Sequence, residues 1–434
     1  MNIRFFHAKI LISEPDHKFR IAEGELWVKG SRICYIGDGE DVMDVCGPDE
    51  VLIWDREIDV KGNLLMPGFK DAHTHTAMTF LRSYADDLPL QEWLNEKVFP
   101  NEARLKEQDP YPLNILGIME YLTSGITADF DMYPYPAITA KAAVDCGFRS
   151  VITSGFNDFV SSVGQMEEEY HQINELSELT SYIPGFHAEY TTSGKHMEEL
   201  ADLANRLKTP VWTHNSETKR EVEECQKRWG KTPTQFMESI GMYEYGGGGY
   251  HCIWFEDEDF EIFRKHRMSV VTNPASNLKL ASGIAPVKRF LDEHINVGIG
   301  TDGPASNNCL DMFREMFLVT GLSKLLEKDA SSMDAMDVLK MATVNGARAM
   351  RLNRADILAK GKFADLIMID LHQPNMQPIH NIPKNLVYSG SKSNVCMTMI
   401  GGKILYRNGE FNVGEDPERI YAKCEKIVKR LLTE

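Results

Sequence analysis

The sequence predicts an α/β protein in which a (β/α)8 TIM barrel is joined to a small β-sandwich formed by the two ends of the chain. Two observations lead to this prediction. In the middle of the chain, short apolar runs alternate with helical stretches such as "KHMEELADLANRLK", as in repeated βα units. Near both ends, short segments of alternating polarity are separated by turn residues, a pattern typical of antiparallel strands.

We expect the β-sandwich to use residues 1–66 and 359–434, and the barrel to use residues 67–358. The strand-like segments are "IRFFHAKILIS", "GELWVKGSRICYIG" and "VLIWDREIDVKG" near the start, and "FADLIMIDL" and "NVCMTMIGGKILYRNGEF" near the end. After them, apolar residues recur at helical spacing, namely Ile420, Cys424, Ile427, Val428 and Leu431. This spacing predicts a final amphipathic helix that covers the body of the protein or a partner subunit.

Eight apolar runs supply the expected barrel strands. They are "LLMPGFKDAHTH", "TADFDMY", "RSVITSGF", "IPGFHAEYT", "TPVWTHNSE", "GGYHCIWF", "SVVTNP" and "INVGIGTDG". In a (β/α)8 barrel the active site lies at the carboxyl ends of the strands. The ends of these runs carry His73, His75, Asp131, Ser154, His187, His214, His251, Asn273 and Asp302. Packing alone does not explain such a series of polar ends, which therefore indicates a functional site.

The composition narrows the class of protein. With 434 residues, of which 43% are hydrophobic and 26% charged, the chain is typical of soluble globular proteins. No apolar run approaches the roughly 20 residues needed to cross a bilayer, and the N-terminus lacks signal-peptide features, so we expect a cytoplasmic protein. The net charge of −17 argues against a nucleic-acid partner, because phosphate binding requires clustered Lys and Arg. The eight cysteines form no CxxC pair, so neither a disulfide framework nor a thiolate zinc site is expected.

Four strand-end residues form a candidate metal site. On a strand, His73 and His75 point the same way. Together with His214 and Asp302 they offer three imidazoles and a carboxylate, which suit one divalent ion, most simply Zn²⁺, although Fe²⁺ or Mn²⁺ also fits. No lysine ends the fourth run, so a bridge between two metals has no obvious source.

Three residues are candidates for moving protons around a metal-activated water. Asp302 could accept the proton of the water, Glu217 could carry a proton to the substrate, and His251 could orient the attacking group. Each residue type also has a structural explanation: His251 could be a buried core histidine, Asp302 a helix cap, and His187 part of the barrel wall. Their joint occurrence at strand ends favours the metal site.

Several motifs resemble those of the amidohydrolase superfamily, and in particular its methylthioadenosine/S-adenosylhomocysteine deaminase branch, which is related to s-triazine chlorohydrolases. They are "PGFKDAHTHTAM", "THNSET", "GGYHC", "NPASNLKLASGIAPV" and "GTDGPASNNCLDMFREM". The stretches "YADDLPLQEWLNEKVFPNE" and "GKFADLIMID" extend the resemblance over nearly the whole chain.

The resemblance implies the same fold, the same four metal ligands and hydrolytic deamination of an adenine ring. It implies proton-handling roles for Glu217 and His251. It also implies that Glu102 binds ribose hydroxyls, that Trp93 borders the base, and that His187 contacts the nucleoside.

The sequence departs from this branch where a substrate carboxylate would bind. Ser154 and Gln165 occupy the expected places of arginines, and "FHAEY" introduces Glu189 beside the expected pocket. Thr272 replaces a histidine of the family pattern. These departures favour methylthioadenosine, deoxyadenosine or adenosine over S-adenosylhomocysteine.

Two alternatives to a nucleoside deaminase remain at this point. One is hydrolysis of another amino-heterocycle, such as guanine, a pterin, creatinine or an s-triazine. The other is a non-catalytic assembly protein on the same fold. Relatives commonly assemble, so a homo-oligomer is possible, but the sequence does not determine the oligomeric state.

Overall fold

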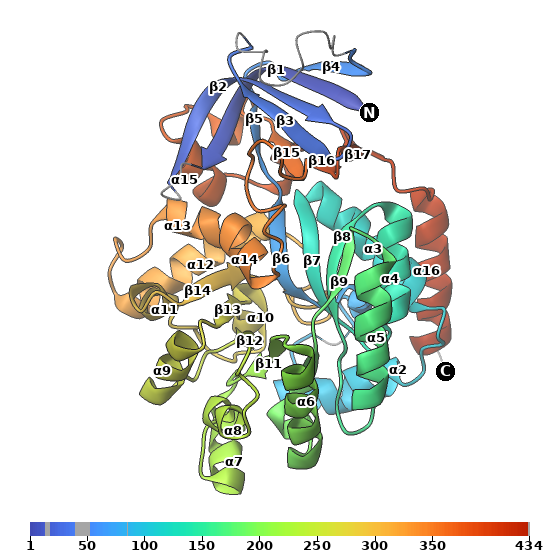
Figure 1. The fold of residues 1–434 in the computed structure, drawn as a ribbon, viewed down its shortest axis with the longest axis vertical. Helices are drawn as coiled ribbons and strands as arrows, with labels where there is room; N and C mark the ends of the chain where they lie inside the picture. The colour runs from blue at the N-terminus through green and yellow to red at the C-terminus, as the bar shows by residue number, and fades with distance from the viewer. Residues whose placement is uncertain (14–17, 40–52, 85, 433–434) are drawn as a thin grey trace.

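The computed structural model describes residues 1–13, 18–39, 53–84 and 86–432. It has two parts, a sheet formed by both ends of the chain and a helix-covered barrel below it in the view of Figure 1. Cys46 and the first two residues of the strand expected over residues 51–62 lie outside the described residues. The seven described cysteines are all free. No described helix is long and apolar enough to cross a membrane.

The terminal sheet joins the N-terminal and C-terminal segments, as predicted. Its strands are β1 (Asn2–Ser13), β2 (Phe19–Lys29), β3 (Arg32–Gly37), β4 (Arg56–Asp59), β5 (Leu64–Pro67), β15 (Leu366–Ile369), β16 (Val395–Ile400), β17 (Lys403–Arg407) and β18 (Glu410–Phe411). They pair in the order β18-β17-β16-β15-β5-β1-β2-β3, with β4 beside β1. The two ends of the chain meet where β5 pairs antiparallel with β15. On β5, Leu65 packs within the terminal part, whereas Leu64 and Met66 pack into the main core, so alternate residues connect the two parts.

The barrel strands are parallel neighbours in chain order, as predicted for βα units. They are β6 (Phe69–Thr74), β7 (Ile126–Met132), β8 (Arg149–Thr153), β9 (Thr180–Tyr182), β10 (Gly185–Ala188), β11 (Val211–Asn215), β12 (Gly247–His251), β13 (Ser269–Thr272) and β14 (Asn296–Ile299). The fourth predicted run begins at Ile183 and contains β10, whereas the short strand β9 ends just before this run and was not predicted. Pro184, which has no N–H to donate to a ladder, lies between the two strands. The backbone N–H of Asp302 donates to the carbonyl of His73 at 3.0 Å and links the last strand to the first.

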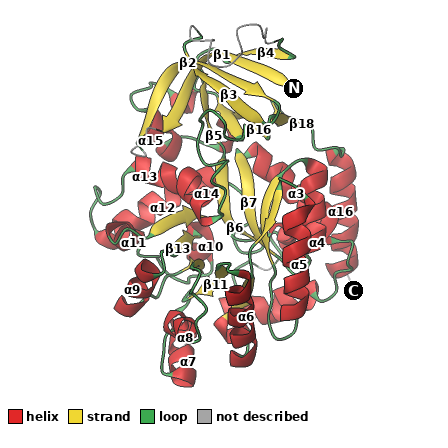
Figure 2. Cartoon of the chain, viewed as in Figure 1, coloured by secondary structure: helices red, strands yellow, loops and turns green. Residues whose placement is uncertain are grey.

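Helices surround the barrel (Figure 2). The helices before β12 are α1 (Leu90–Glu92), α2 (Phe99–Glu102), α3 (Pro110–Thr123), α4 (Pro136–Cys146), α5 (Val163–Leu176), α6 (Gly194–Leu207), α7 (Lys219–Trp229) and α8 (Pro233–Ser239). Those after it are α9 (Asp257–Lys265), α10 (Pro274–Lys279), α11 (Val287–Asp292), α12 (Met312–Glu327), α13 (Ala335–Lys340), α14 (Gly346–Ala349), α15 (Ile382–Tyr388) and α16 (Pro417–Leu432). Short helical turns are η1 (Thr76–Leu81), η2 (Trp93–Val98), η3 (Glu189–Thr191), η4 (Met341–Asn345), η5 (Pro374–Met376) and η6 (Lys392–Asn394).

The last helix, α16, is the amphipathic helix that its apolar spacing predicts. Its buried residues are Ile420, Cys424, Ile427 and Leu431, while Val428 is only partly buried. The helix packs beside α3 on the flank of the barrel (Figure 1), where the thiol of Cys424 donates to the carbonyl of Pro112. It therefore covers the body of its own chain.

A buried ion pair joins the barrel to the terminal sheet. Arg149, at the start of β8, donates from Nε to Asp365 Oδ2 at 2.6 Å and from Nη2 to Oδ1 at 3.1 Å. The side chains are 3% and 0% exposed, and Asp365 directly precedes β15. Since the pair is bidentate and desolvated, it fixes the position of the two parts relative to each other.

We expect Asp365→Ala to lower the free energy of unfolding by about 3–5 kcal/mol, because the Arg149 guanidinium would stay buried without its counter-charge. Urea unfolding followed by circular dichroism measures the change. Lys141→Ala, which breaks an exposed pair with Asp145, is the matched control and should cost less than about 1 kcal/mol. Equal effects of the two variants would contradict this role of Asp365.

Candidate active site

A cavity of about 620 Å³ opens where the barrel strands end. The predicted site residues that line it are His75, Trp93, Glu102, His187, His214, Glu217, His251 and Asp302. His73 is fully buried next to this group. The structure thus brings together all the residues that the sequence predicts for metal binding, proton transfer and substrate contact.

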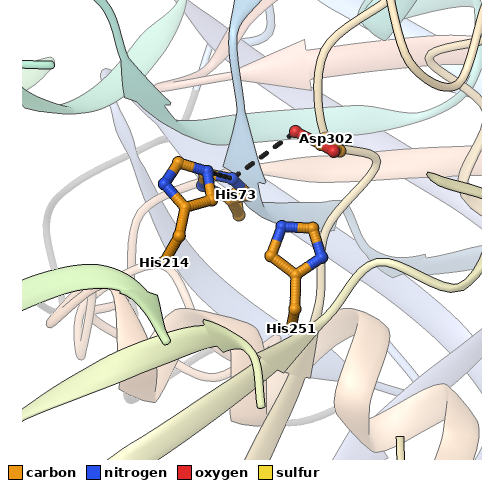
Figure 3. Close-up of side chains that lie close together, drawn as sticks. All are labelled: His73, His214, His251 and Asp302. Carbon is orange, nitrogen blue, oxygen red and sulfur yellow. Dashed lines mark hydrogen bonds and ion pairs between the residues drawn. The ribbon is translucent and has the colours of Figure 1, made fainter. Parts of the chain in front are cut away.

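The imidazole rings of His73, His214 and His251 and the carboxylate of Asp302 lie close together (Figure 3). Nε2 of His73 lies 3.1 Å from Nε2 of His214 and 3.6 Å from Oδ1 of Asp302. Nε2 of His75 lies 3.2 Å from the same Oδ1. Four side-chain atoms that can bind a metal, from the ends of β6 and β11 and from the turn after β14, therefore face one point.

Hydrogen bonds to backbone carbonyls determine the tautomers of two of these histidines. Nδ1 of His75 lies 2.6 Å from the carbonyl oxygen of Met132, and Nδ1 of His214 lies 2.7 Å from that of His187. Because a carbonyl oxygen only accepts, each Nδ1 carries the hydrogen and each neutral ring presents the lone pair of Nε2 to the cluster.

This donor set fits a divalent metal. Lone pairs and a carboxylate that face each other at these distances repel unless a cation lies among them. Burial, followed by the neighbouring histidines, holds the pKa of His73 and of His214 well below the ordinary value, so both rings are neutral and have a lone pair that a metal could accept. Burial also lowers the pKa of His75, but the hydrogen bond to Asp302 raises it to about 9.

Either of two histidines can complete the cluster. Ligand atoms of His73, His214, His251 and Asp302 all lie within 4.8 Å of one another. However, Nδ1 of His251 lies 2.6 Å from Asn277 Oδ1, and its Nε2 lies 3.9 Å from Glu217 Oε2. His251 thus also faces the carboxylate of Glu217, whereas Nε2 of His75 faces only the cluster.

Backbone strain and a close contact shape the site. His251 and Asp302 have positive φ angles of 68° and 57°, a conformation that non-glycine residues adopt rarely and at an energetic cost. Gly300 is required beside His73, because an added Cβ would lie 2.7 Å from the His73 carbonyl oxygen. The strand ends are therefore bent to direct these side chains into the cavity.

Glu217 is placed to exchange protons with a bound molecule. It is buried but lines the cavity, and its Oε1 accepts a hydrogen bond from Ser282 Oγ at 3.0 Å. Its backbone N–H donates to Glu221 Oε2, and Glu221 also closes the capping box of α7 with Thr218. Burial raises the pKa of Glu217 above its ordinary value. The carboxyl group is thereby held firmly and favours its protonated form more than an exposed one does.

Polar and aromatic groups line the remainder of the cavity. The carboxyl group of Glu102 and the hydroxyl of Tyr133 interact with each other, and both residues line the cavity. Burial raises the pKa of Glu102 to about 7 and lowers that of His187 to about 3. Trp93 is 6% exposed and offers a flat apolar wall. Tyr133 is absent from the sequence-based site, although it follows the second predicted strand end by two residues.

Glu189 follows His187 and precedes Tyr190, which both line the cavity, but its own carboxylate points away from the cavity. Its carboxylate is buried against α7, where it accepts hydrogen bonds from Arg228 and from Trp229 Nε1, and it does not line the cavity. Ser154 and Gln165 do not line the cavity either, and Gln165 donates to Glu169. Thr272 is buried at the end of β13 and is not part of the cavity wall.

The charge of the cavity nevertheless supports the sequence-based view of its substrate. Its described lining contains the carboxylates Glu102, Glu217 and Asp302 but no lysine or arginine. An anionic substrate group would therefore find no cationic partner among these residues.

Fold and site together define a barrel protein with a candidate metal centre at the carboxyl ends of its strands. The chain belongs to the amidohydrolase family, whose model matches residues 64–405. It is 38% identical over 445 residues to a 5-methylthioadenosine/S-adenosylhomocysteine deaminase from Caldanaerobacter subterraneus subsp. tengcongensis, covering 100% of this chain and 99% of the relative. A 5′-deoxyadenosine deaminase from Methanothermobacter thermautotrophicus is 37% identical over 420 residues, covering 94% and 95%.

A solved structure extends the similarity to three dimensions. The crystal structure of an adenosine deaminase from Xanthomonas campestris with bound zinc matches with a TM-score of 0.92 and 30% identity, covering 100% of this chain and 98% of that protein. The predicted superfamily and branch are thus confirmed.

Proposed function

We propose that the protein is a metal-dependent hydrolytic deaminase that releases ammonia from the adenine ring of nucleosides. The observation that carries the proposal is the convergence of three imidazoles and Asp302 in one cavity, with Glu217 beside them. The names of the relatives, which refer to methylthioadenosine, S-adenosylhomocysteine and 5′-deoxyadenosine, support it.

We infer one divalent metal ion per chain, held by His73, His75, His214 and Asp302. Zinc is the simplest choice for this donor set and is bound in the similar adenosine deaminase, while Fe²⁺ and Mn²⁺ are also compatible. The strand β10, which lies in the fourth predicted run, ends at Ala188 and carries no lysine that could bridge two metal ions. This supports a single ion. When bound, such an ion polarises a water molecule and makes it nucleophilic near neutral pH.

The residues of the chain supply the rest of the chemistry. Glu217 gives a proton to a ring nitrogen of the substrate, which makes the amino-bearing carbon more electrophilic. His251, 3.9 Å from Glu217, orients the attacking water, and Asp302 accepts its proton. Asp302 passes this proton to the amino group, which leaves as ammonia, and the added hydroxyl returns a proton to Glu217 as it becomes the carbonyl of the product. Trp93 borders the base, Glu102 binds the ribose hydroxyls, and His187 contacts the nucleoside. The nucleophile and the proton donor are thus both positioned around the reacting carbon. This lowers the activation barrier for deamination through proximity and electrostatic stabilisation.

The absence of cations in the described cavity lining predicts substrate choice. We expect methylthioadenosine, 5′-deoxyadenosine and adenosine to react with a kcat/KM about ten- to a hundred-fold higher than S-adenosylhomocysteine, because a charge-assisted hydrogen bond contributes roughly 1.5–3 kcal/mol. Ultraviolet spectroscopy, which follows the loss of the adenine chromophore, measures all four reactions, with free adenine and guanine as controls.

The outcomes separate the parts of the proposal. Clear preference for S-adenosylhomocysteine would show that some other group binds its carboxylate. If a different amino-heterocycle reacted and no adenosine compound did, the metal centre would stand but the nucleoside assignment would fail.

A further inference from the structure

A phenylalanine is exposed at the mouth of the cavity. Phe159 lies in the loop after β8, is 91% exposed, and is nevertheless one of the residues that line the cavity. Its neighbour Val160 also lines the cavity, as do Leu94 and Tyr135. Phe159 is therefore the outermost residue of an apolar part of the cavity wall. It is not an isolated hydrophobic residue on the surface, which would need no functional explanation.

Hydrogen bonds hold this loop in one conformation. The side-chain oxygen of Asn157 accepts from the backbone N–H groups of Phe159 at 2.9 Å and Val160 at 3.1 Å. The carboxylate of Asp158 accepts from the backbone N–H of Ser193 at 2.8 Å and lies 2.7 Å from Nδ1 of His196. These hydrogen bonds fix the backbone on both sides of Phe159, so its apolar side chain is held in a defined place although it is in water.

The same loop is attached to the strand that carries His187. The backbone N–H of His187 donates to the carbonyl of Phe156 at 2.8 Å, and that of Asp158 donates to the carbonyl of Thr191 at 3.1 Å. Phe159 consequently has a defined position relative to a residue that we place against the nucleoside.

The arrangement of the cavity determines which part of a nucleoside reaches Phe159. The reacting ring must lie at the inner end, beside Glu217 and the metal ligands, and the polar groups of Glu102 and Tyr133 suit ribose hydroxyls. In that position the remaining substituent, on the 5′ carbon, would extend towards the mouth of the cavity, where Phe159 and Val160 line the wall.

We propose that Phe159, together with Val160, is the specificity-determining contact for the 5′ substituent and selects apolar groups such as methylthio over hydroxyl. This inference rests on the proposed function and narrows its substrate class to adenosines with a small, uncharged and apolar 5′ group, such as methylthioadenosine and 5′-deoxyadenosine. The ligand covers an aromatic surface that is otherwise in water, which stabilises the complex through burial of apolar area.

The test compares methylthioadenosine with adenosine, which differ at the 5′ position. We expect Phe159→Ala to lower kcat/KM for methylthioadenosine by about ten-fold and to affect adenosine much less, since small apolar contacts are worth roughly ten-fold or more in discrimination. Phe159→Leu should keep most of the preference. The same difference is expected in the dissociation constants of the products, methylthioinosine and inosine, measured by calorimetry.

Phe317→Ala is the matched control, because Phe317 is a 52% exposed phenylalanine on α12 outside the cavity lining. It should leave both substrates unchanged. An equal loss for both substrates in Phe159→Ala, or no loss for either, overturns the inference while leaving the deaminase proposal intact. If the unaltered protein deaminates neither nucleoside, the proposed function itself fails.

Discussion

His73→Ala and His214→Ala are each expected to abolish both metal binding and turnover. The two Nε2 atoms lie 3.1 Å apart and, with Asp302, form the part of the cluster that is common to both ligand sets. Loss of one imidazole removes a metal ligand, and the remaining ligand atoms are too few to bind the ion tightly in the buried site. Metal analysis of purified protein should show a decrease from about one ion per chain to near zero, alongside loss of ammonia release.

His171→Ala is the matched control, since His171 lies exposed on α5 and should affect neither quantity. Full activity in a preparation verified to be metal-free would refute the metal-dependent mechanism.

A further pair of variants identifies the fourth ligand. His75→Ala should lose the metal, whereas His251→Ala should keep the metal and lose turnover, because Nε2 of His251 faces Glu217. The opposite result would exchange their roles.

Much of the barrel and sheet architecture could be predicted from the sequence, because the spacing of apolar residues directly indicates strands and helices. Apolar runs of strand length, separated by amphipathic helices, indicate parallel strands, and their polar ends indicate where the site must lie. His73, His214 and Asp302 are remote in the chain, yet the barrel topology alone requires their strand ends to meet. The short strand-like segments near both ends of the chain, which contain β1 and β15, likewise predicted a sheet made from both ends.

The features that could not be predicted depend on tertiary contacts between side chains. Glu189 follows a predicted strand end, but its direction is determined by Arg228 and Trp229 on α7, forty residues later in the chain. The exposure of Phe159 depends on the hydrogen bonds that Asn157 and Asp158 accept in the loop. The pattern of apolar residues in the sequence does not indicate such bonds. In the same way, the choice between His75 and His251 as ligand depends on hydrogen bonds to Met132 and Asn277 rather than on spacing.

Glu217→Gln tests proton transfer separately from metal binding and folding. The amide has nearly the same shape as the carboxyl group, and its oxygen can still accept the hydrogen bond from Ser282. It cannot, however, deliver a proton to the substrate ring. We therefore expect the variant to keep its metal and its thermal stability while turnover falls by at least about 100-fold, the usual scale of general acid–base catalysis.

Glu223→Gln provides the control on the same helix, because Glu223 is exposed and pairs only with Lys219 across one turn. Its turnover should match that of the unaltered protein. A near-normal rate in Glu217→Gln would limit Glu217 to its structural place before α7, where its backbone N–H donates to Glu221. A low rate accompanied by loss of metal would instead mean that the carboxylate supports the metal centre. Only the combination of retained metal, retained stability and slow turnover identifies Glu217 as the group that carries the proton.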